Sequence, residues 1–139
     1  MRTALHIIAM LLLLSGCYKD EIDLEGMKNN PFDRDYQGPA VIELVGTYVE
    51  STTIAGAPAQ QQVIEFRVRE ELFLTPSPYA LHVVEHGVNA TYTLSPVTPG
   101  SDRFKYYRLG AITADPVCVD VALTNNGSFA TPYTICASL

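Results

Sequence analysis

Two histidines and a glutamate lie close together in the segment His82-Val83-Val84-Glu85-His86. Imidazole nitrogens bind Zn²⁺, and a nearby glutamate can act as a general base toward a metal-bound water. Residues four apart share one face of an α-helix, so this spacing suits a zinc site when the segment is helical. The segment is therefore the first candidate for chemistry in the chain.

The order of these residues resembles H-x-x-E-H, the zinc motif of the inverted-zincin metallopeptidases. The surrounding sequence instead favours a strand, because prolines lie just upstream, Gly87 follows at once and the valines are β-branched. On a strand, His82 and His86 share one face while Glu85 points to the other. We expect ordinary strand residues here, with metal binding by His82 and His86 as a weaker alternative.

The rest of the sequence offers no catalytic constellation. Asp33-Arg34-Asp35 carries oxygen ligands suited to calcium, but the glycine and the distal glutamate of an EF-hand loop are missing. There is no nucleophile elbow, no phosphate loop and no pair of carboxylates beside a histidine. We therefore expect a protein that is not an enzyme and that needs no cofactor.

Tyrosines give a different possibility, a platform on which sugars stack. The chain has 8 tyrosines and no tryptophan, and carbohydrate-binding surfaces usually present exposed aromatic rings. Tyr79, Tyr92, Tyr106 and Tyr107 could supply such a platform if their rings share one exposed face. The lack of tryptophan weighs against this alternative.

The amino terminus has the three parts of a secretory signal. Arg2 gives a positive start, Ala4–Leu14 is an apolar run too short to span a bilayer, and Leu14-Ser15-Gly16-Cys17 follows. This last segment resembles the lipobox of bacterial lipoproteins. The resemblance implies cleavage before Cys17 and lipid on the Cys17 sulfur, so that 1–16 is a signal peptide and the mature chain is held in a membrane.

Residues 17–37 are predicted to form an acidic tether between the lipid and a folded domain. Lys19, Asp20 and Glu21 follow the lipidated cysteine, in an order similar to the export signal of small surface-exposed Bacteroidota lipoproteins. That similarity implies display on the outer face of the outer membrane, with the periplasmic face as the alternative. An acidic, solvated tether would look much the same.

The net charge of the chain argues against nucleic acid as a partner. The chain has 9 Lys and Arg against 15 Asp and Glu, a net charge of −6, and an acidic surface without a basic stripe is repelled by nucleic acid.

Once Cys17 takes the lipid, Cys118 and Cys136 remain as an even pair in an oxidising compartment. They lie at equal distances from Gly127, so a hairpin turning at Asn126-Gly127 with an odd loop places them opposite each other and predicts a disulfide.

From residue 38 to 139 the apolar period changes to two, which predicts one all-β domain. In Val63–Arg69, Ile64, Phe66 and Val68 alternate with charged residues, as in a strand with one buried face. The seven expected strands, with bounds approximate, are Ala40–Val49, Val63–Arg69, Tyr79–Glu85, Val88–Leu94, Phe104–Leu109, Val117–Leu123 and Phe129–Ala137.

Seven short strands with regular turn signals favour an antiparallel immunoglobulin-like or fibronectin-III-like β-sandwich. Tyr92-Thr93-Leu94, followed by Pro99-Gly100 and then Tyr106 and Tyr107, resembles the region around the fibronectin-III tyrosine corner. We expect a membrane-anchored accessory or interaction subunit of an outer-membrane protein complex. A carbohydrate- or ligand-binding module is the alternative.

Overall fold

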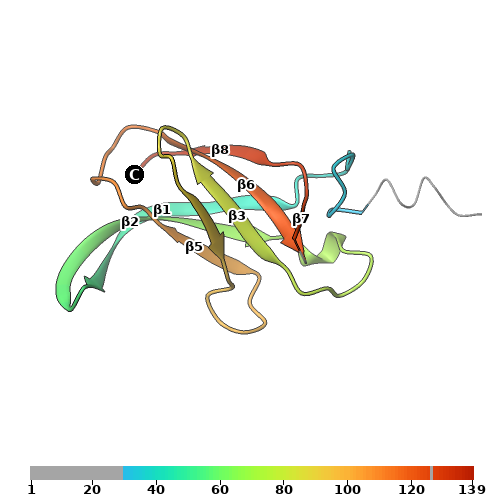
Figure 1. Cartoon of the computed structure of the whole chain (residues 1–139), viewed down its shortest axis with the longest axis horizontal. Helices are drawn as coiled ribbons and strands as arrows, with labels where there is room; N and C mark the ends of the chain where they lie inside the picture. The colour runs from blue at the N-terminus through green and yellow to red at the C-terminus, as the bar shows by residue number, and fades with distance from the viewer. Residues whose placement is uncertain (1–29, 126) are drawn as a thin grey trace, which may run out of the picture.

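Two antiparallel sheets face each other in the computed structural model, which describes residues 30–125 and 127–139 (Figure 1). Eight strands and one short 3-10 turn are found in these residues. They are β1 Ile42–Ile54, β2 Ala57–Val68, η1 Glu70–Leu72, β3 Ala80–Glu85, β4 Thr91–Leu94, β5 Arg103–Tyr107, β6 Val117–Asn125, β7 Ser128–Phe129 and β8 Tyr133–Ala137.

One sheet has three strands in the order β1-β2-β5, and the other has five, with β4-β3-β6-β7 in one row and β8 also paired to β6. The predicted all-β antiparallel sandwich is thereby confirmed, and its arrangement is compatible with an immunoglobulin-like fold. The strand count is eight among the described residues because the last predicted strand, Phe129–Ala137, is divided into β7 and β8.

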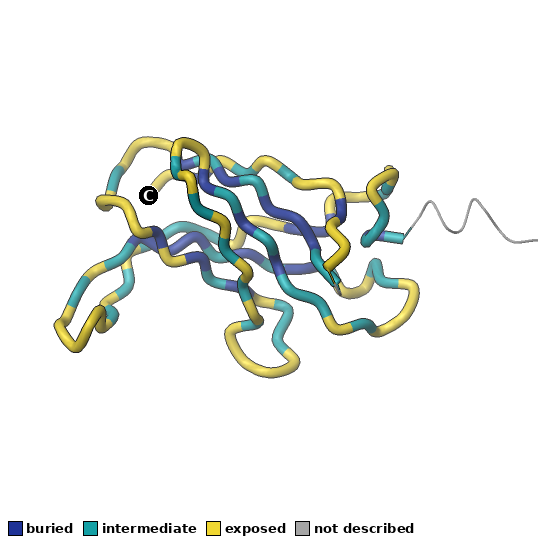
Figure 2. Tube along the Cα trace, in the orientation of Figure 1, coloured by how far each residue is buried: buried dark blue, intermediate teal, exposed yellow. Residues whose placement is uncertain are grey.

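The core lies between the sheets and follows the alternation of the sequence. Ile64, Phe66 and Val68 of β2 are fully buried, and the charged residues between them point outward, as predicted. Figure 2 shows the buried residues on the facing strands and the exposed ones in loops and at the ends. The other strands add the rest of the core: Leu81, Val83, Phe104, Tyr106, Val117, Val119, Val121 and Leu123.

β1 and β2 form a much longer hairpin than the sequence predicted. Their ladder continues from Ile42↔Val68 to Ile54↔Ala57, so it includes residues 50–62, which had no strand assignment. The turn is Ala55-Gly56, in which both residues have positive φ, 50° and 85°. Two positive φ values are typical of the two-residue turns that suit the twist of a hairpin.

The β6–β8 pairing carries the predicted disulfide. Cys118 and Cys136 are direct partners in the ladder and are bonded, with Cα atoms 4.0 Å apart. The predicted odd loop is wrong, however, because Asn125↔Ser128 closes the turn with two residues. One extra residue enters between β7 and β8, at Ala130–Pro132, where proline cannot donate to the ladder.

The described chain contacts the sandwich before the predicted domain boundary at residue 38. The ring of Phe32 packs against Phe73, with centroids 5.0 Å apart, and the Thr131 hydroxyl donates to the carbonyl oxygen of Arg34. Pro31 is buried. Residues 30–37, at the carboxyl-terminal end of the predicted tether, therefore form part of the domain surface.

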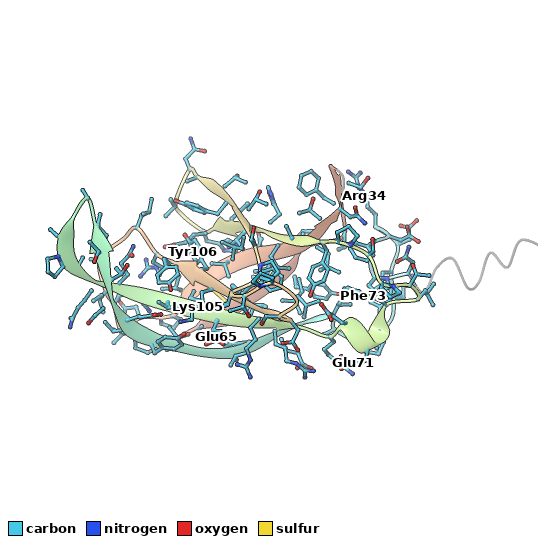
Figure 3. The ribbon with its side chains drawn as sticks, turned by 90° about the horizontal axis from the view of Figure 1, so that it is seen from below. Arg34, Glu65, Glu71, Phe73, Lys105 and Tyr106 are labelled. Carbon is cyan, nitrogen blue, oxygen red and sulfur yellow. A yellow bond between two sulfur atoms is a disulfide. The ribbon has the colours of Figure 1, made fainter. Side chains whose placement is uncertain are left out.

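The sandwich has two different ends. Residues 30–40 and η1 lie at one end, and Figure 3 shows Arg34, Phe73 and Glu71 there. The tip of the β1–β2 hairpin, the β5–β6 loop and the chain's carboxyl terminus lie at the opposite end (Figure 1). We call the first the entry end and the second the far end.

Candidate functional site

His82 and His86 have different partners in the structure. His86 Nε2 lies 3.0 Å from Asp120 Oδ1, while the ring of His82 packs edge-on against Phe129 at 4.8 Å between centroids. Within residues 30–125 and 127–139, no three His, Cys, Asp or Glu side chains gather as possible metal ligands. The segment does form a strand, β3, as its valines predicted.

A shallow groove of about 400 Å³ lies on the outer face of the five-stranded sheet beside His82. Phe129 forms part of it and is 42% exposed. The lining is mostly apolar: His82, Val84, Asp120, Ala122, Phe129, Ala130 and Pro132. Such a groove can receive an apolar side chain, but it does not assemble groups for a reaction.

The four tyrosines expected to form a platform do not share a face. Tyr92 packs on Tyr106 in the interior, with ring centroids 5.2 Å apart, and Tyr79 packs on Phe104. Tyr107 lies on the outer face of the three-stranded β1-β2-β5 sheet, where its hydroxyl donates to Glu50 at 3.3 Å.

The resemblance to a tyrosine corner is not supported by these contacts. A tyrosine corner needs a phenol that donates to backbone a few residues upstream. The Tyr106 hydroxyl instead donates to the side chain of Glu85, and burial followed by this hydrogen bond raises the Tyr106 pKa. Tyr92 Oη has no hydrogen-bond partner among the described residues.

The chemically most unusual group is an ion pair in the interior, near the far end. Arg108 donates from Nη2 to Glu85 Oε1 at 2.7 Å and from Nε to the same oxygen at 3.1 Å. The side chains are only 10% and 4% exposed. Tyr106 completes the carboxylate's partners by donating to Oε2 at 2.8 Å.

These hydrogen bonds set the charge of Glu85. Burial alone would raise the pKa of Glu85, but the hydrogen bonds from Arg108 and then Tyr106 outweigh it, so the pKa lies below the ordinary value. The carboxylate is therefore ionised and paired at neutral pH. Its partners satisfy it fully, which indicates a structural group and not a reactive one.

The same guanidinium holds the loop that follows β5. Arg108 Nη1 donates to the carbonyl oxygen of Ala111 at 3.0 Å and to Gln62 Oε1 at 2.7 Å. Gln62 Oε1 also accepts from the backbone N–H of Thr113 at 3.2 Å. Two points of the β5–β6 loop are thus fixed to the buried cluster of β2, β3 and β5.

The far end presents four large apolar side chains, two of them on this fixed loop. Leu109 is 73% exposed and Ile112 is 43% exposed in the β5–β6 loop, and Ile54 at the hairpin tip and Leu139 at the carboxyl terminus are each 48% exposed. We call these four residues the far-end surface. Their segments lie at the same end of the sandwich (Figure 1).

The far end is also poor in charge. No charged residue occurs between Glu50 and Glu65, and Asp115 is the single charge between Arg108 and Asp120. The acids and bases of the outer β1-β2-β5 face instead pair with one another, as in Lys105–Glu50 at 2.8 Å and Arg103–Glu65 at 2.9 Å. Figure 3 shows Lys105 and Glu65 on that face.

Sequence reasoning missed the Arg108–Glu85 pair, although a signal for it was present. Arg108 shares the face of Phe104 and Tyr106 in the alternation of its strand, and Glu85 lies opposite His82 on β3. Both charges therefore fall on inward positions. Because charges are rarely buried unless paired, two inward charges of opposite sign on different strands predict such a contact.

The residues that carry the lipoprotein prediction lie outside the described part of the chain. They are Cys17 and the export residues Lys19, Asp20 and Glu21. In the described residues, no helix has the length and apolar character needed to cross a bilayer.

Comparisons with known proteins give the chain no family. Neither the protein-family models, nor the curated proteins, nor the solved structures contain a match.

Proposed function

We propose that this chain is a lipid-anchored surface lipoprotein that serves as a non-enzymatic accessory subunit of an outer-membrane protein complex. The resemblance of Leu14-Ser15-Gly16-Cys17 to a lipobox supports the anchor. The observation that carries the interaction role is the apolar far-end surface, which is poor in charge and whose β5–β6 loop is held by the buried Arg108–Glu85 pair. Apolar side chains exposed together on a protein surface are typical of contact sites with other proteins.

The position of the anchor relative to this surface supports the same role. Cys17 precedes Asn30 by 13 positions, and residues 30–40 lie at the entry end, opposite the far-end surface (Figure 1). Because the lipid-bearing segment joins the domain at the entry end, the far-end surface is left accessible to a partner. Loops at one end of a rigid sandwich are a common location for binding residues.

We further propose display on the outer face of the outer membrane, through Lys19, Asp20 and Glu21. On intact cells, added protease should digest the wild-type domain. A variant with Lys19, Asp20 and Glu21 all replaced by neutral residues should become protected, because it stays on the periplasmic face. Full protection of the wild type would contradict outward display.

Carbohydrate binding has less support. Tyr106 is buried and Tyr92 is partly buried against it, so these two rings do not form an exposed platform for a sugar.

A photo-crosslinking amino acid at position 112 in the full-length, membrane-anchored chain tests the interaction role. The matched control is the same amino acid at position 74, because Leu74 is 65% exposed and lies near η1 at the entry end. We expect irradiated cells to give a product with a single outer-membrane protein from position 112 and not from position 74. Products of equal yield from both positions, or none from position 112, would contradict the proposal.

A further inference from the structure

β1 is one of the two outer strands of its sheet and the longest strand described, with 13 residues. In residues 30–125 and 127–139 it pairs only with β2. Its side chains are unusually exposed for an apolar strand: Leu44 is 41%, Val45 42% and Val49 41% exposed. β1 therefore presents an apolar edge with a row of backbone groups that no other described strand satisfies.

The other outer strands carry the features that protect sheet edges. β4 has four residues, β5 has five and includes Arg103 and Lys105, and β7 is separated from β8 at Pro132. Short strands, basic residues and proline all prevent pairing with another chain. β1 has no lysine, arginine or proline, and its bulge, between Leu44 and Gly46, leaves Gly46–Ile54 regular.

The charges on β1 are already compensated within the chain. Glu50 accepts from Lys105 Nζ at 2.8 Å, and Glu43 lies 3.5 Å from Arg69 Nε. Leu44–Val49 itself carries no charge. A second copy of this acidic chain is repelled over most of its surface, but two β1 edges meet without a clash of like charges.

We propose that the free edge of β1 pairs antiparallel with β1 of a second copy of this chain. A two-fold contact of this kind places the same edge on both sides, so a residue i that faces residue j of the partner copy is matched by j facing i. Apart from Glu50, which Lys105 pairs within its own chain, Gly46–Ile54 consists of glycine, apolar and hydroxyl residues, so the two edges bring no uncompensated like charges together. Pairing joins the two three-stranded sheets into a single six-stranded sheet and covers Val49 in both copies.

This arrangement is compatible with two chains anchored in one membrane. The two-fold axis is perpendicular to β1, so when it stands along the membrane normal both entry ends lie at the same height. Confinement to a membrane also raises the effective concentration of the copies, which favours a contact of modest area. The far-end surface is not used, so the inference does not depend on the accessory role.

Two full-length copies with different affinity tags, expressed in the same cells, test the pairing after mild detergent solubilisation. One tag should capture the other copy. Val45→Glu with Val49→Glu in both copies should lower this capture at least tenfold, because the carboxylates added to one copy would face those added to the other. Val97→Glu is the matched control, since Val97 is 48% exposed outside β1, and it should leave the capture unchanged.

A third variant, Ile112→Glu, separates this pairing from co-residence in a larger complex. It should remove any outer-membrane partner while keeping the second copy. Capture that is absent in the wild type, unchanged in the β1 variant or lost in Ile112→Glu would overturn the proposal. Capture of a different protein through β1 in place of the second copy would also overturn it.

Discussion

Arg108 directs two nitrogens, Nε and Nη2, at a single oxygen of Glu85, at 3.1 and 2.7 Å. The pair joins β3 to the residue that follows β5, so it connects the two sheets through the interior. Buried ion pairs seldom add much net stability, but breaking one leaves an uncompensated charge. Here the remaining donor of Arg108 also holds Ala111, which links the pair to the shape of the far end.

Replacing Arg108 by methionine should destabilise the domain by about 3–5 kcal/mol, because Glu85 would stay buried without its partner. Arg67→Met is the matched control, since Arg67 bonds Asp102 at 2.7 Å but is 41% exposed. The control should cost less than about 1 kcal/mol. Urea unfolding followed by circular dichroism measures both, and equal losses would contradict the structural role of the buried pair.

Stability should fall in acid through Glu85. The folded pKa of Glu85 is lowered from its ordinary value of 4.5, so the pair's contribution is fully present above that value. It is lost as the pH falls through the lower, folded pKa. Urea midpoints between pH 6 and pH 3 should therefore drop less steeply in Glu85→Gln than in the wild type. Parallel curves for the two proteins would refute this linkage.

The disulfide should stabilise the domain without being part of the deepest core. Cys118 and Cys136 are 18 positions apart, and closing such a loop is worth about 3 kcal/mol in the chain-entropy model. The double variant Cys118→Ser with Cys136→Ser should lose about that much and keep its strand content by circular dichroism. Mass spectrometry of the unreduced wild type checks the bond itself, and two alkylatable thiols at these positions would disprove it.

Anchoring should depend on one sulfur. Cys17→Ala removes the thiol that the lipobox resemblance assigns to the lipid, and cleavage follows lipidation, so the variant should accumulate as a longer precursor without label. Metabolic labelling with a fatty-acid analogue measures this, with Cys118→Ser and Cys136→Ser as the control that keeps its lipid. A labelled and normally processed Cys17→Ala protein would rule out the assignment.

The sequence predicted those parts of the fold that depend on local alternation. Ile64, Phe66 and Val68 identified the buried face of β2, and equal spacing about Gly127 identified the partners Cys118 and Cys136. Period-two patterns carry this information because neighbouring side chains of a strand point to opposite faces.

Features set by long-range pairing were not predictable in the same way. The hairpin segment 50–62 contains three alanines, Gly56 and Pro58, residue types that are depleted in strands, and the β1–β2 ladder overrides this low propensity. The pairing of Cys118 with Cys136 had the right register for a wrong reason, since a two-residue turn plus one extra residue replaces the expected odd loop.

The candidate site was the least predictable part. Its residues come from the hairpin tip, the β5–β6 loop and the carboxyl terminus, which are far apart in the sequence and lie at one end only in the folded sandwich. Loops have no periodicity that would mark Leu109 or Ile112 as exposed. The sequence did carry one signal, the inward position of Arg108. That signal points to the buried pair that holds the β5–β6 loop, and not to the exposed residues of the far-end surface.

Quantitative co-purification from solubilised membranes tests the central claim most directly. With Leu109→Glu and Ile112→Glu in the full-length chain, the amount of outer-membrane partner that co-purifies should fall at least tenfold, because two carboxylates would enter an apolar contact. Leu74→Glu, at the entry end, should retain the partner in full, and all three proteins should unfold at similar urea concentrations. A partner retained equally by the far-end variant and by Leu74→Glu would contradict the account.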